Sequence, residues 1–242
     1  MCGRFSAISE TDVLKKRFKA KGLEIKKRKN INNRVKKKYN IAPLDYAQVI
    51  TPDLVINEFR WGLVPPFSKD SCFAPKMINA RAETVNQKLS FKTLFEKGQR
   101  CLIPSEGFYE FPISEGGKHA YRICLKDNQI FSFAGLYSSW INPKTQENLN
   151  TFTILTCPPN SLIQPEVGLN IHDRMPVLLA EKNEGLWLST DTSHEKLLNI
   201  LKPYPSDTMK AYEVNESVKN VHFEGEDCWK AFEAVNPFDW LK

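Results

Sequence analysis

The sequence lacks any long apolar run. No stretch approaches the roughly 18 to 20 apolar residues that a membrane-spanning helix needs. The opening MCGRFSAISE also lacks the basic start and apolar core of a signal peptide. We therefore expect no association with a membrane and a cytoplasmic location, at the nucleoid in a bacterium or in the nucleus of a eukaryote.

Cysteine motifs and glycine-rich motifs are equally scarce. The six cysteines include no Cys-x-x-Cys pair, and none lies at a metal-ligand spacing from a histidine, so they predict neither a zinc site nor a disulfide scaffold. Neither common glycine-rich phosphate loop is present, which disfavours chemistry driven by a nucleotide. We expect most cysteines to be small buried apolar side chains, and we expect no metal and no cofactor.

Positive charge is concentrated in one segment. The formal net charge is +6, yet thirteen Lys and Arg residues face the single acid Glu24 between Lys15 and Lys38. One interpretation is a solvated helix and loop. The other is an arm that attracts a polyanion, and lysines among asparagines with few aromatics suit phosphate contacts better than base reading.

Short segments rich in β-branched and aromatic residues predict a β-rich core. They are Gln48–Thr51, Leu54–Leu63, Cys101–Phe111, Ala120–Leu125, Ile130–Leu136 and Phe152–Thr156. Helical spacing predicts helices over Val85–Glu96, Ala180–Leu188 and Ser193–Leu201.

A further helix is predicted to begin near Ser9 and Asp12, to end near Gly22, and to carry Val13, Leu14 and Phe18 on one side. The 242 residues show no repeat, no linker and no regular alternation of strand and helix. We therefore expect an α+β fold, in which residues 1–242 form a single domain with a β-barrel-like, mostly antiparallel core and peripheral helices.

Cys2 is the first candidate for chemistry. A small residue at position two permits removal of Met1, which would leave a terminal residue with both an amine and a thiol. Reference pKa values near 8 for the amine and 8.5 for the thiol place both close to reactivity at neutral pH. Together they can condense with an aldehyde, first as a Schiff base and then as a thiazolidine ring. An incidental thiol is the alternative.

Three internal motifs add polar side chains. In the segment 77–84, alternation places Asn79, Arg81 and Glu83 on one face if the segment is extended, where an amide and a guanidinium can orient an amine and hold a phosphate. An exposed strand edge is the alternative.

In the segment 100–111, Glu106 and Glu110 flank an aromatic pair, and burial would raise the pKa of either carboxyl toward 7, where it suits acid–base catalysis. A surface glutamate is the alternative. In the segment 170–176, His172 can transfer a proton and Arg174 can bind a phosphate, or the histidine is structural.

In this order, the motifs resemble the SOS response-associated peptidase (SRAP) family. The resemblance runs over nearly the whole chain, through MCGRF, YNIAP, RWGLVPPF, INARAET, RCLIPSEGFYEF, AGLY and HDRMPVLL. It implies a compact β-barrel-like core surrounded by helices, with a positively charged channel leading to the N-terminal cysteine.

The resemblance also implies residue roles. Cys2 would be the nucleophile that forms a DNA–protein crosslink, and the other matched active-site residues are Asn79, Glu110 and His172. Of the two glutamates, Glu110 is the one that matches the family's GFYE motif. The implied DNA contacts are Arg4, Arg81 and Arg174 at phosphates, Pro43 and Phe67 where bases are unstacked, and Thr156 in the pocket.

Two features depart from the family. Phe67 and Phe111 stand where many relatives have Trp, so stacking on a base should be at the lower end of about 1–3 kcal/mol. The Lys-rich insertion at about 15–38 is longer and more basic than the resemblance leads us to expect, so its role is inferred from charge alone.

We therefore expect a monomeric sensor that crosslinks through Cys2 to abasic sites in single-stranded DNA or at junctions of single and double strands, because an unstacked sugar must reach the thiol and amine. Two alternatives stay open. One is an autoproteolytic cysteine peptidase-like protein that removes its own Met1. The other is a non-covalent reader of modified or damaged DNA.

Overall fold

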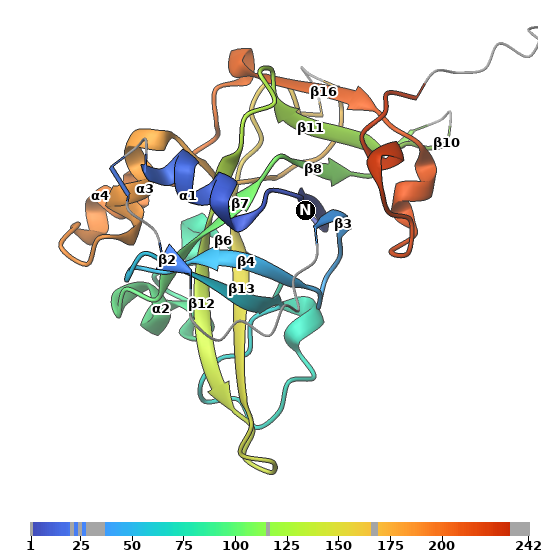
Figure 1. The fold of residues 1–242 in the computed structure, drawn as a ribbon. Coiled ribbons are helices and arrows are strands. Elements are labelled where there is room, and N and C mark those ends of the chain that lie inside the picture. The colour runs from blue at the N-terminus through green and yellow to red at the C-terminus, as the bar shows by residue number, and fades with distance from the viewer. Residues whose placement is uncertain are drawn as a thin grey trace, which may run out of the picture.

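The computed structural model describes residues 2–19, 22–23, 26–27, 37–114, 117–165 and 169–232. Helices are short and lie around a β-rich centre (Figure 1). The α-helices in these ranges are α1 Thr11–Lys19, α2 Leu89–Glu96, α3 Glu181–Leu188 and α4 His194–Asn199. The 3-10 helices are η1 Ala74–Lys76, η2 Ala82–Thr84, η3 Ser206–Thr208, η4 Glu216–Lys219 and η5 Glu226–Cys228.

The larger sheet has the strand order β14-β13-β12-β7-β4-β5-β2, with β15 paired to β12 and β6 paired to β13. Its strands are β2 Lys26–Lys27, β4 Tyr46–Ile50, β5 Val55–Trp61, β6 Asn79–Arg81, β7 Arg100–Ser105, β12 Phe131–Ile141, β13 Asn148–Cys157, β14 Met175–Pro176 and β15 Leu178–Leu179. The long β12–β13 hairpin projects from the body of the protein (Figure 1).

A second sheet has the order β16-β11-β8-β1-β3, and all of its pairings are antiparallel. Its strands are β1 Arg4–Ala7, β3 Lys38–Ile41, β8 Gly107–Glu110, β11 Tyr121–Leu125 and β16 Met209–Glu213, and a separate pair is formed by β9 Ile113–Ser114 and β10 Gly117–Lys118. The two sheets share one apolar core, which confirms the expected single α+β domain with a barrel-like, mostly antiparallel centre.

Aromatic side chains join the two sheets at the core. Phe5 of β1 packs edge-on against Trp61 of β5 and Phe133 of β12, with ring centroids 5.1 and 5.8 Å apart. Phe108 of β8 contacts the same Phe133 at 6.0 Å. Edge-to-face pairs of this kind add about 0.5–1.5 kcal/mol beyond the burial of apolar area. The N-terminal strand is therefore fixed on the core close to residue 2.

The predicted strand over Cys101–Phe111 is two strands. β7 belongs to the larger sheet and β8 to the smaller one, and the chain turns between them at Glu106. The Glu106 carboxylate accepts hydrogen bonds from the backbone N–H groups of Ile8 and Ser9 and from the Ser9 hydroxyl. This corner ties the end of β1 to the start of β8. The Ser9 hydroxyl is bonded to Glu106, and α1 begins two residues later, at Thr11.

The helices largely follow their predicted ranges. In α1, Leu14 and Phe18 are buried, whereas Val13 is 49% exposed and does not share the buried side. The helix predicted from Val85 begins only at Leu89, because a turn in which Gln87 and Lys88 donate to the Thr84 carbonyl comes first. None of the helices in the described ranges combines the length and the apolar character that a bilayer crossing needs.

Candidate active site at the N-terminus

Strand register brings Cys2 to the end of β8. Arg4 pairs with Tyr109 and Phe5 with Phe108, so the residues before β1 continue alongside Glu110 and Phe111. Cys2 is fully buried, and its thiol lies 3.6 Å from the carbonyl oxygen of Arg4. Residues 2 and 110 are therefore neighbours although 107 residues separate them in the chain.

Asn79 approaches the same place from β6. This strand pairs in parallel with β13, with Asn79 opposite Ile154. The Asn79 side-chain N–H donates to the carbonyl oxygen of Cys2 at 2.8 Å, so the amide fixes the backbone of the residue that carries the candidate nucleophile. The Oδ1 atom of Asn79 is buried and accepts no hydrogen bond from the residues that the structure describes.

Burial sets the protonation of Glu110 and Cys2. Glu110 is 3% exposed, and removal from water raises its pKa to about 7. Burial also raises the pKa of the Cys2 thiol well above its usual range, and the nearby Glu110 charge adds to this effect. At neutral pH the thiol is therefore protonated, and the Glu110 carboxyl can either give or take a proton.

The other carboxyl of the motif, Glu106, differs in its surroundings. Its oxygens accept hydrogen bonds from Ile8 and Ser9, which follow β1, and it lies at the corner between the two sheets. Only Glu110 is electrostatically linked to Cys2. Of the two glutamates, Glu110 is therefore the one that lies near Cys2.

His172 lies in the loop before β14 and is half-buried. Its Nδ1 atom lies 3.0 Å from the backbone N–H of Arg174 and 2.5 Å from a carboxylate oxygen of Asp173. Burial lowers the pKa of His172, so the neutral ring dominates at pH 7. The N–H group favours the tautomer protonated at Nε2 and the carboxylate favours the one protonated at Nδ1. The Arg174 N–H and the Asp173 carboxylate thus stabilise different tautomers of His172.

Arg174 lies two residues after His172 and is held by two residues, Glu83 and Thr156. Its Nη1 and Nη2 atoms donate to the two carboxylate oxygens of Glu83 at 2.6 and 2.8 Å, and Nη2 also donates to the Thr156 carbonyl at 2.7 Å. This ion pair holds the pKa of Glu83 below its usual range, so the carboxyl is charged at neutral pH. The sequence did not predict the contact of Glu83 with Arg174, because the two residues are 91 positions apart.

Thr156 connects these groups through β13. It lies opposite Arg81 of β6 on one side and Pro176 of β14 on the other, and its side chain is fully buried. Arg81 is exposed. Thr156 therefore lies between Arg81 and the segment that carries Arg174. The extended conformation predicted for the segment 77–84 holds for Asn79 and Arg81 in β6, but Glu83 lies in the 3-10 helix η2 and does not continue that strand face.

The remaining predicted DNA contacts have different surroundings. Arg4 is half-buried, and its guanidinium donates to the carbonyl oxygens of Val218 and Lys219 at 3.3 and 3.1 Å, which anchors β1 to η4. Pro43 follows β3, and the β1–β3 register continued by two residues places it beside Gly3.

Phe67 is 59% exposed in the loop after β5. This loop is fixed to β12, because the indole N–H of Trp140 donates to the Ser68 carbonyl at 2.8 Å. Phe111, the other departure from the family, is half-buried and packs against the small apolar cluster around Tyr109. The exposed ring is therefore Phe67.

Five of the six cysteines are fully buried and one, Cys72, is exposed, as expected for small apolar side chains. The described part of the chain contains no group of three or more His, Cys, Asp or Glu side chains arranged to hold a metal ion.

Cys2 is thus buried beside the Asn79 amide and beside Glu110, whose pKa is about 7, on a fold of two sheets that share one core. The chain belongs to the SOS response associated peptidase (SRAP) family, whose sequence model matches residues 1–221.

Relatives within that family are similar over most of the chain. The abasic site processing protein YoqW of Bacillus subtilis is 40% identical over 231 residues, which cover 91% of this chain and 95% of the relative. The abasic site processing protein HMCES of Gallus gallus is 28% identical over 198 residues, covering 72% of this chain and 56% of that protein. A crystal structure of a Bacteroides thetaiotaomicron protein matches with a TM-score of 0.79 at 28% identity, covering 89% and 93% of the two chains.

Proposed function

We propose that this protein captures abasic sites in single-stranded DNA by a covalent bond to Cys2, once Met1 has been removed. The observation that carries the proposal is the hydrogen bond of 2.8 Å from Asn79 to the Cys2 carbonyl, beside a buried Glu110 whose pKa is about 7. The names of the YoqW and HMCES relatives, both abasic site processing proteins, support it.

The order of bond formation follows from the protonation states. Because burial keeps the Cys2 thiol protonated, the terminal amine is the better first nucleophile at neutral pH. Its lone pair attacks the aldehyde carbon of the opened sugar, and loss of one water leaves an imine. The thiol then adds across the carbon–nitrogen double bond, its proton passes to nitrogen, and a thiazolidine ring results.

Asn79 and Glu110 have separate roles in these reaction steps. The buried Oδ1 of Asn79 can accept an N–H of the Cys2 amine and so direct its lone pair toward the sugar. Glu110 donates a proton when the sugar ring opens and when water leaves, which a carboxyl with a pKa of about 7 can do at neutral pH. His172, neutral and stabilised in either tautomer, relays protons between the site and Asp173.

The DNA strand would pass Arg81 and Arg174, which lie near each other around Thr156. Arg81 is exposed and offers a full set of donors to a phosphate, whereas Arg174 is fixed by Glu83 and Thr156 and offers a positioned charge. Phe67 is exposed on a fixed loop and supplies a face on which a base can stack. A sugar can reach buried Cys2 only from an unpaired or sharply bent strand.

A denaturing gel tests the proposal. The protein is incubated with a single-stranded oligonucleotide whose one uracil has been excised by uracil glycosylase, and with the intact oligonucleotide as control. We expect a slow-migrating product that survives denaturant only with the excised strand, and its loss in Cys2→Ser and in a variant with extra residues before Cys2. A non-covalent reader of damaged DNA would bind the strand but yield no such product.

Removal of Met1 has its own measurement. Intact mass of the wild type and of Glu110→Gln shows whether Met1 is absent from each. Met1 retained only in Glu110→Gln would indicate self-processing, since the same carboxyl would serve both reactions. Met1 absent from both would assign the step to an aminopeptidase.

A further inference from the structure

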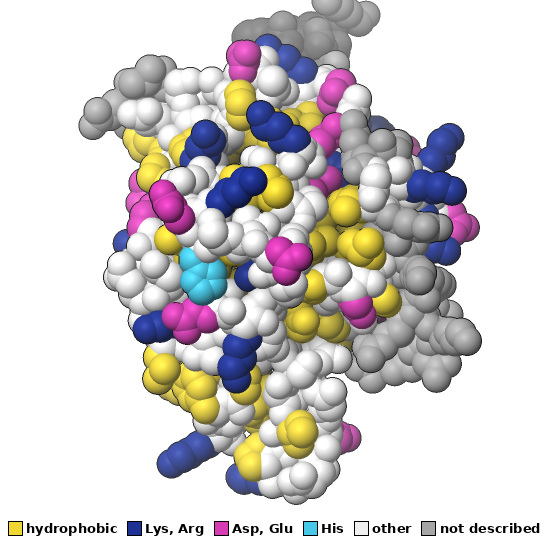
Figure 2. All heavy atoms as spheres, turned by 90° about the vertical axis from the view of Figure 1, so that its left-hand side faces the viewer, with side chains coloured by type: hydrophobic (Ala, Val, Ile, Leu, Met, Phe, Trp, Pro, Cys, Tyr) yellow, Lys and Arg dark blue, Asp and Glu magenta, His cyan; other side chains and the backbone are white. Residues whose placement is uncertain are grey.

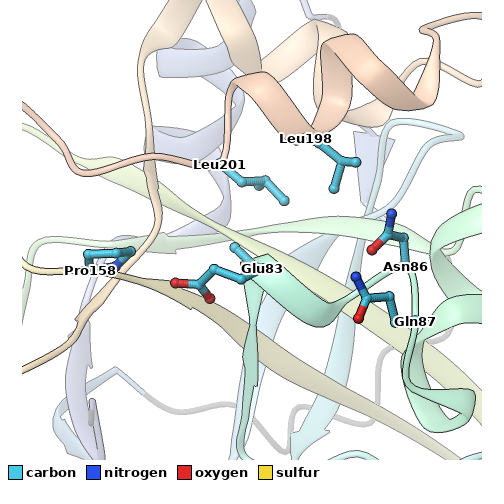
Figure 3. A pocket seen from close by; sticks show the side chains of 7 residues that line it. Glu83, Asn86, Gln87, Pro158, Leu198 and Leu201 are labelled. Carbon is cyan, nitrogen blue, oxygen red and sulfur yellow. The ribbon is translucent and has the colours of Figure 1, made fainter.

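A cavity of about 300 Å³ lies next to Arg174, because Glu83, the ion-pair partner of Arg174, lines it. The chemistry proposed above does not use this cavity. Its walls come from the turn after β6, from the residue after β13 and from the segment at α4. Figure 3 shows side chains from these three segments facing a common space, with Leu198 and Leu201 opposite Glu83, Asn86 and Gln87, and Pro158 at one end.

The cavity has an apolar side and a polar side. Leu201 is buried, Leu198 is half-buried, and with Pro158 they form an apolar surface. The amide groups of Asn86 and Gln87 face it and form no hydrogen bond with another described residue. A side-chain amide offers both donors and an acceptor, so the polar side can match either kind of group on a ligand.

The cavity lies next to Arg81 and Arg174, the residues proposed to contact DNA phosphates. Glu83 lines the cavity and also holds the Arg174 guanidinium through two hydrogen bonds. Ala82, which directly follows Arg81, lines it as well. Asn79 and Arg81 are about 7 Å apart along the extended strand, so a strand whose sugar reaches Cys2 would bring a neighbouring nucleotide to this cavity.

We infer that the cavity is a subsite for the base of a nucleotide that flanks the abasic site, an inference that rests on the proposed function. A nucleobase has apolar faces and an edge of hydrogen-bond donors and acceptors, which are the two kinds of surface the cavity presents. Because the two amides can rotate, the subsite accepts any base and favours a base over a bare sugar. The enzyme thereby positions the reactive sugar through the neighbour of that sugar as well as through phosphates.

Equilibrium binding of unreactive strands tests this inference without requiring the crosslink. Each oligonucleotide carries a tetrahydrofuran residue, an abasic analogue with no aldehyde, at its centre. A second tetrahydrofuran then replaces one flanking nucleotide at a time on either side, which removes one base and keeps the backbone. Fluorescence anisotropy measures the dissociation constant of each strand.

For the wild type we expect one flanking position at which loss of the base weakens binding about five- to tenfold, as a single well-contacted base contributes. In the double variant Asn86→Ala and Gln87→Ala, the strand with all its bases should bind more weakly, and removal of the base at that position should have no further effect. Asn199→Ala is the control, because it removes an exposed amide from α4 that does not line the cavity.

Equal weakening at every flanking position would overturn the subsite, and so would a double variant as sensitive to the missing base as the wild type. Thermal unfolding midpoints of the variants, which should equal that of the wild type, exclude loss of fold as the cause. Failure of the proposed function would look different. The wild type would then form no product on the denaturing gel, whatever the pattern of flanking-base sensitivity.

Discussion

At the residue scale, Glu110 combines a cost in stability with a use in chemistry. A carboxyl normally titrates near 4.5, and burial moves the pKa of this one to about 7. Above that pH the folded protein has to hold a charge away from water, which the unfolded chain does not. Retention of such a group is easiest to understand if its protonation near neutrality is used by the site.

Replacement of Glu110 by Gln should therefore stabilise the fold at alkaline pH. Below pH 4.5 both the folded and unfolded states are protonated, and the wild type loses no stability from this group. Between 4.5 and about 7 the unfolded state releases its proton first, so wild-type stability falls as the pH rises. At about 1.4 kcal/mol for each pH unit, the difference reaches roughly 3 kcal/mol.

Urea unfolding at pH 4 and pH 8 measures this difference. Glu110→Gln should gain stability relative to the wild type at pH 8 and lose that gain at pH 4. Glu96→Gln, at an exposed position in α2, should change the free energy of unfolding by less than about 0.5 kcal/mol at either pH. A Glu110 variant that is less stable than the wild type at pH 8 would show that the carboxyl is not held in a desolvated state.

The same carboxyl predicts the pH dependence of crosslinking. Since its protonated form is the acid, the observed rate constant should decline as the pH rises above about 7. In Glu110→Gln the rate should be lower by roughly 10²- to 10⁴-fold, and this decline should vanish. Quenched-flow or gel time courses from pH 5 to 9 provide the profile, and an unchanged decline in the variant would assign it to another group.

At the scale of elements, the close packing of β12 between β7 and β13 depends on Gly135. A Cβ atom there would lie 2.3 Å from the Ile103 side chain and 2.8 Å from the backbone oxygen of Thr153. One of these neighbours is backbone, so the strands themselves would have to separate. The consequence extends to the site, because β13 also aligns β6 and its Asn79.

Gly135→Ala should therefore lower the free energy of unfolding by about 1–3 kcal/mol. Gly185→Ala is the matched control, since its Cβ in α3 would meet only Leu23 at 3.7 Å, an ordinary contact. There the helix should gain about 1 kcal/mol from the lower entropy of the unfolded chain. Chemical denaturation of both variants measures whether each change lowers or raises the free energy of unfolding. Equal effects in the two variants would contradict the packing described for β12.

Helices and strands could be predicted from the sequence where the local residue pattern determines them. They were harder to predict where contacts with distant residues determine them. The ranges of α3 and α4 follow from apolar spacing, and the six strand segments were found. The split at Glu106 was not, because it depends on the N–H groups of Ile8 and Ser9 almost a hundred residues away. β1, β3 and β16 were missed for the same reason, since their partners and not their composition define them.

The candidate site shows the same division. Motif matching named Cys2, Asn79, Glu110 and His172, and the fold brings the first three of them into contact or electrostatic range. The pairing of Arg174 with Glu83 and the anchoring of Arg4 on η4 could not be predicted, because a sequence states which side chains carry charge and not which partners they meet.

At the scale of the whole molecule, the basic segment between Lys15 and Lys38 dominates the charge, and residues 28–36 of it lie outside the described residues. On the face shown in Figure 2, the coloured Lys and Arg side chains alternate with Asp and Glu and form no large patch of one sign. Attraction of DNA by the segment therefore stays a prediction from charge, and salt dependence is its natural test.

Neutralising part of the segment should weaken the salt dependence of DNA binding. If the four replaced residues each contact a phosphate of a single strand, the slope of log K against log salt should shrink by up to about 3. Crosslinking at saturating DNA should be unchanged, since none of these residues belongs to the proposed active site. The replacements are Arg28→Gln, Lys29→Gln, Arg34→Gln and Lys36→Gln.

A matched set separates local from general charge effects. It replaces four exposed lysines elsewhere by Gln, which alters the net charge by the same amount, at Lys126, Lys144, Lys182 and Lys196. The slope should change less in this set than in the first. Equal slopes in the two sets would mean that the segment is a solvated surface with no special part in binding DNA.

The proposed function depends on one bond, between the sugar of an abasic site and residue 2. Mass spectrometry of the trypsin-digested and nuclease-digested crosslink locates that bond directly. We expect the peptide Cys2–Arg4, without Met1, carrying the sugar phosphate with the loss of one water and unreactive toward borohydride, as a thiazolidine is. A sugar attached to a lysine, an adduct that borohydride reduces as an open imine, or a crosslinked peptide that retains Met1 would contradict the account.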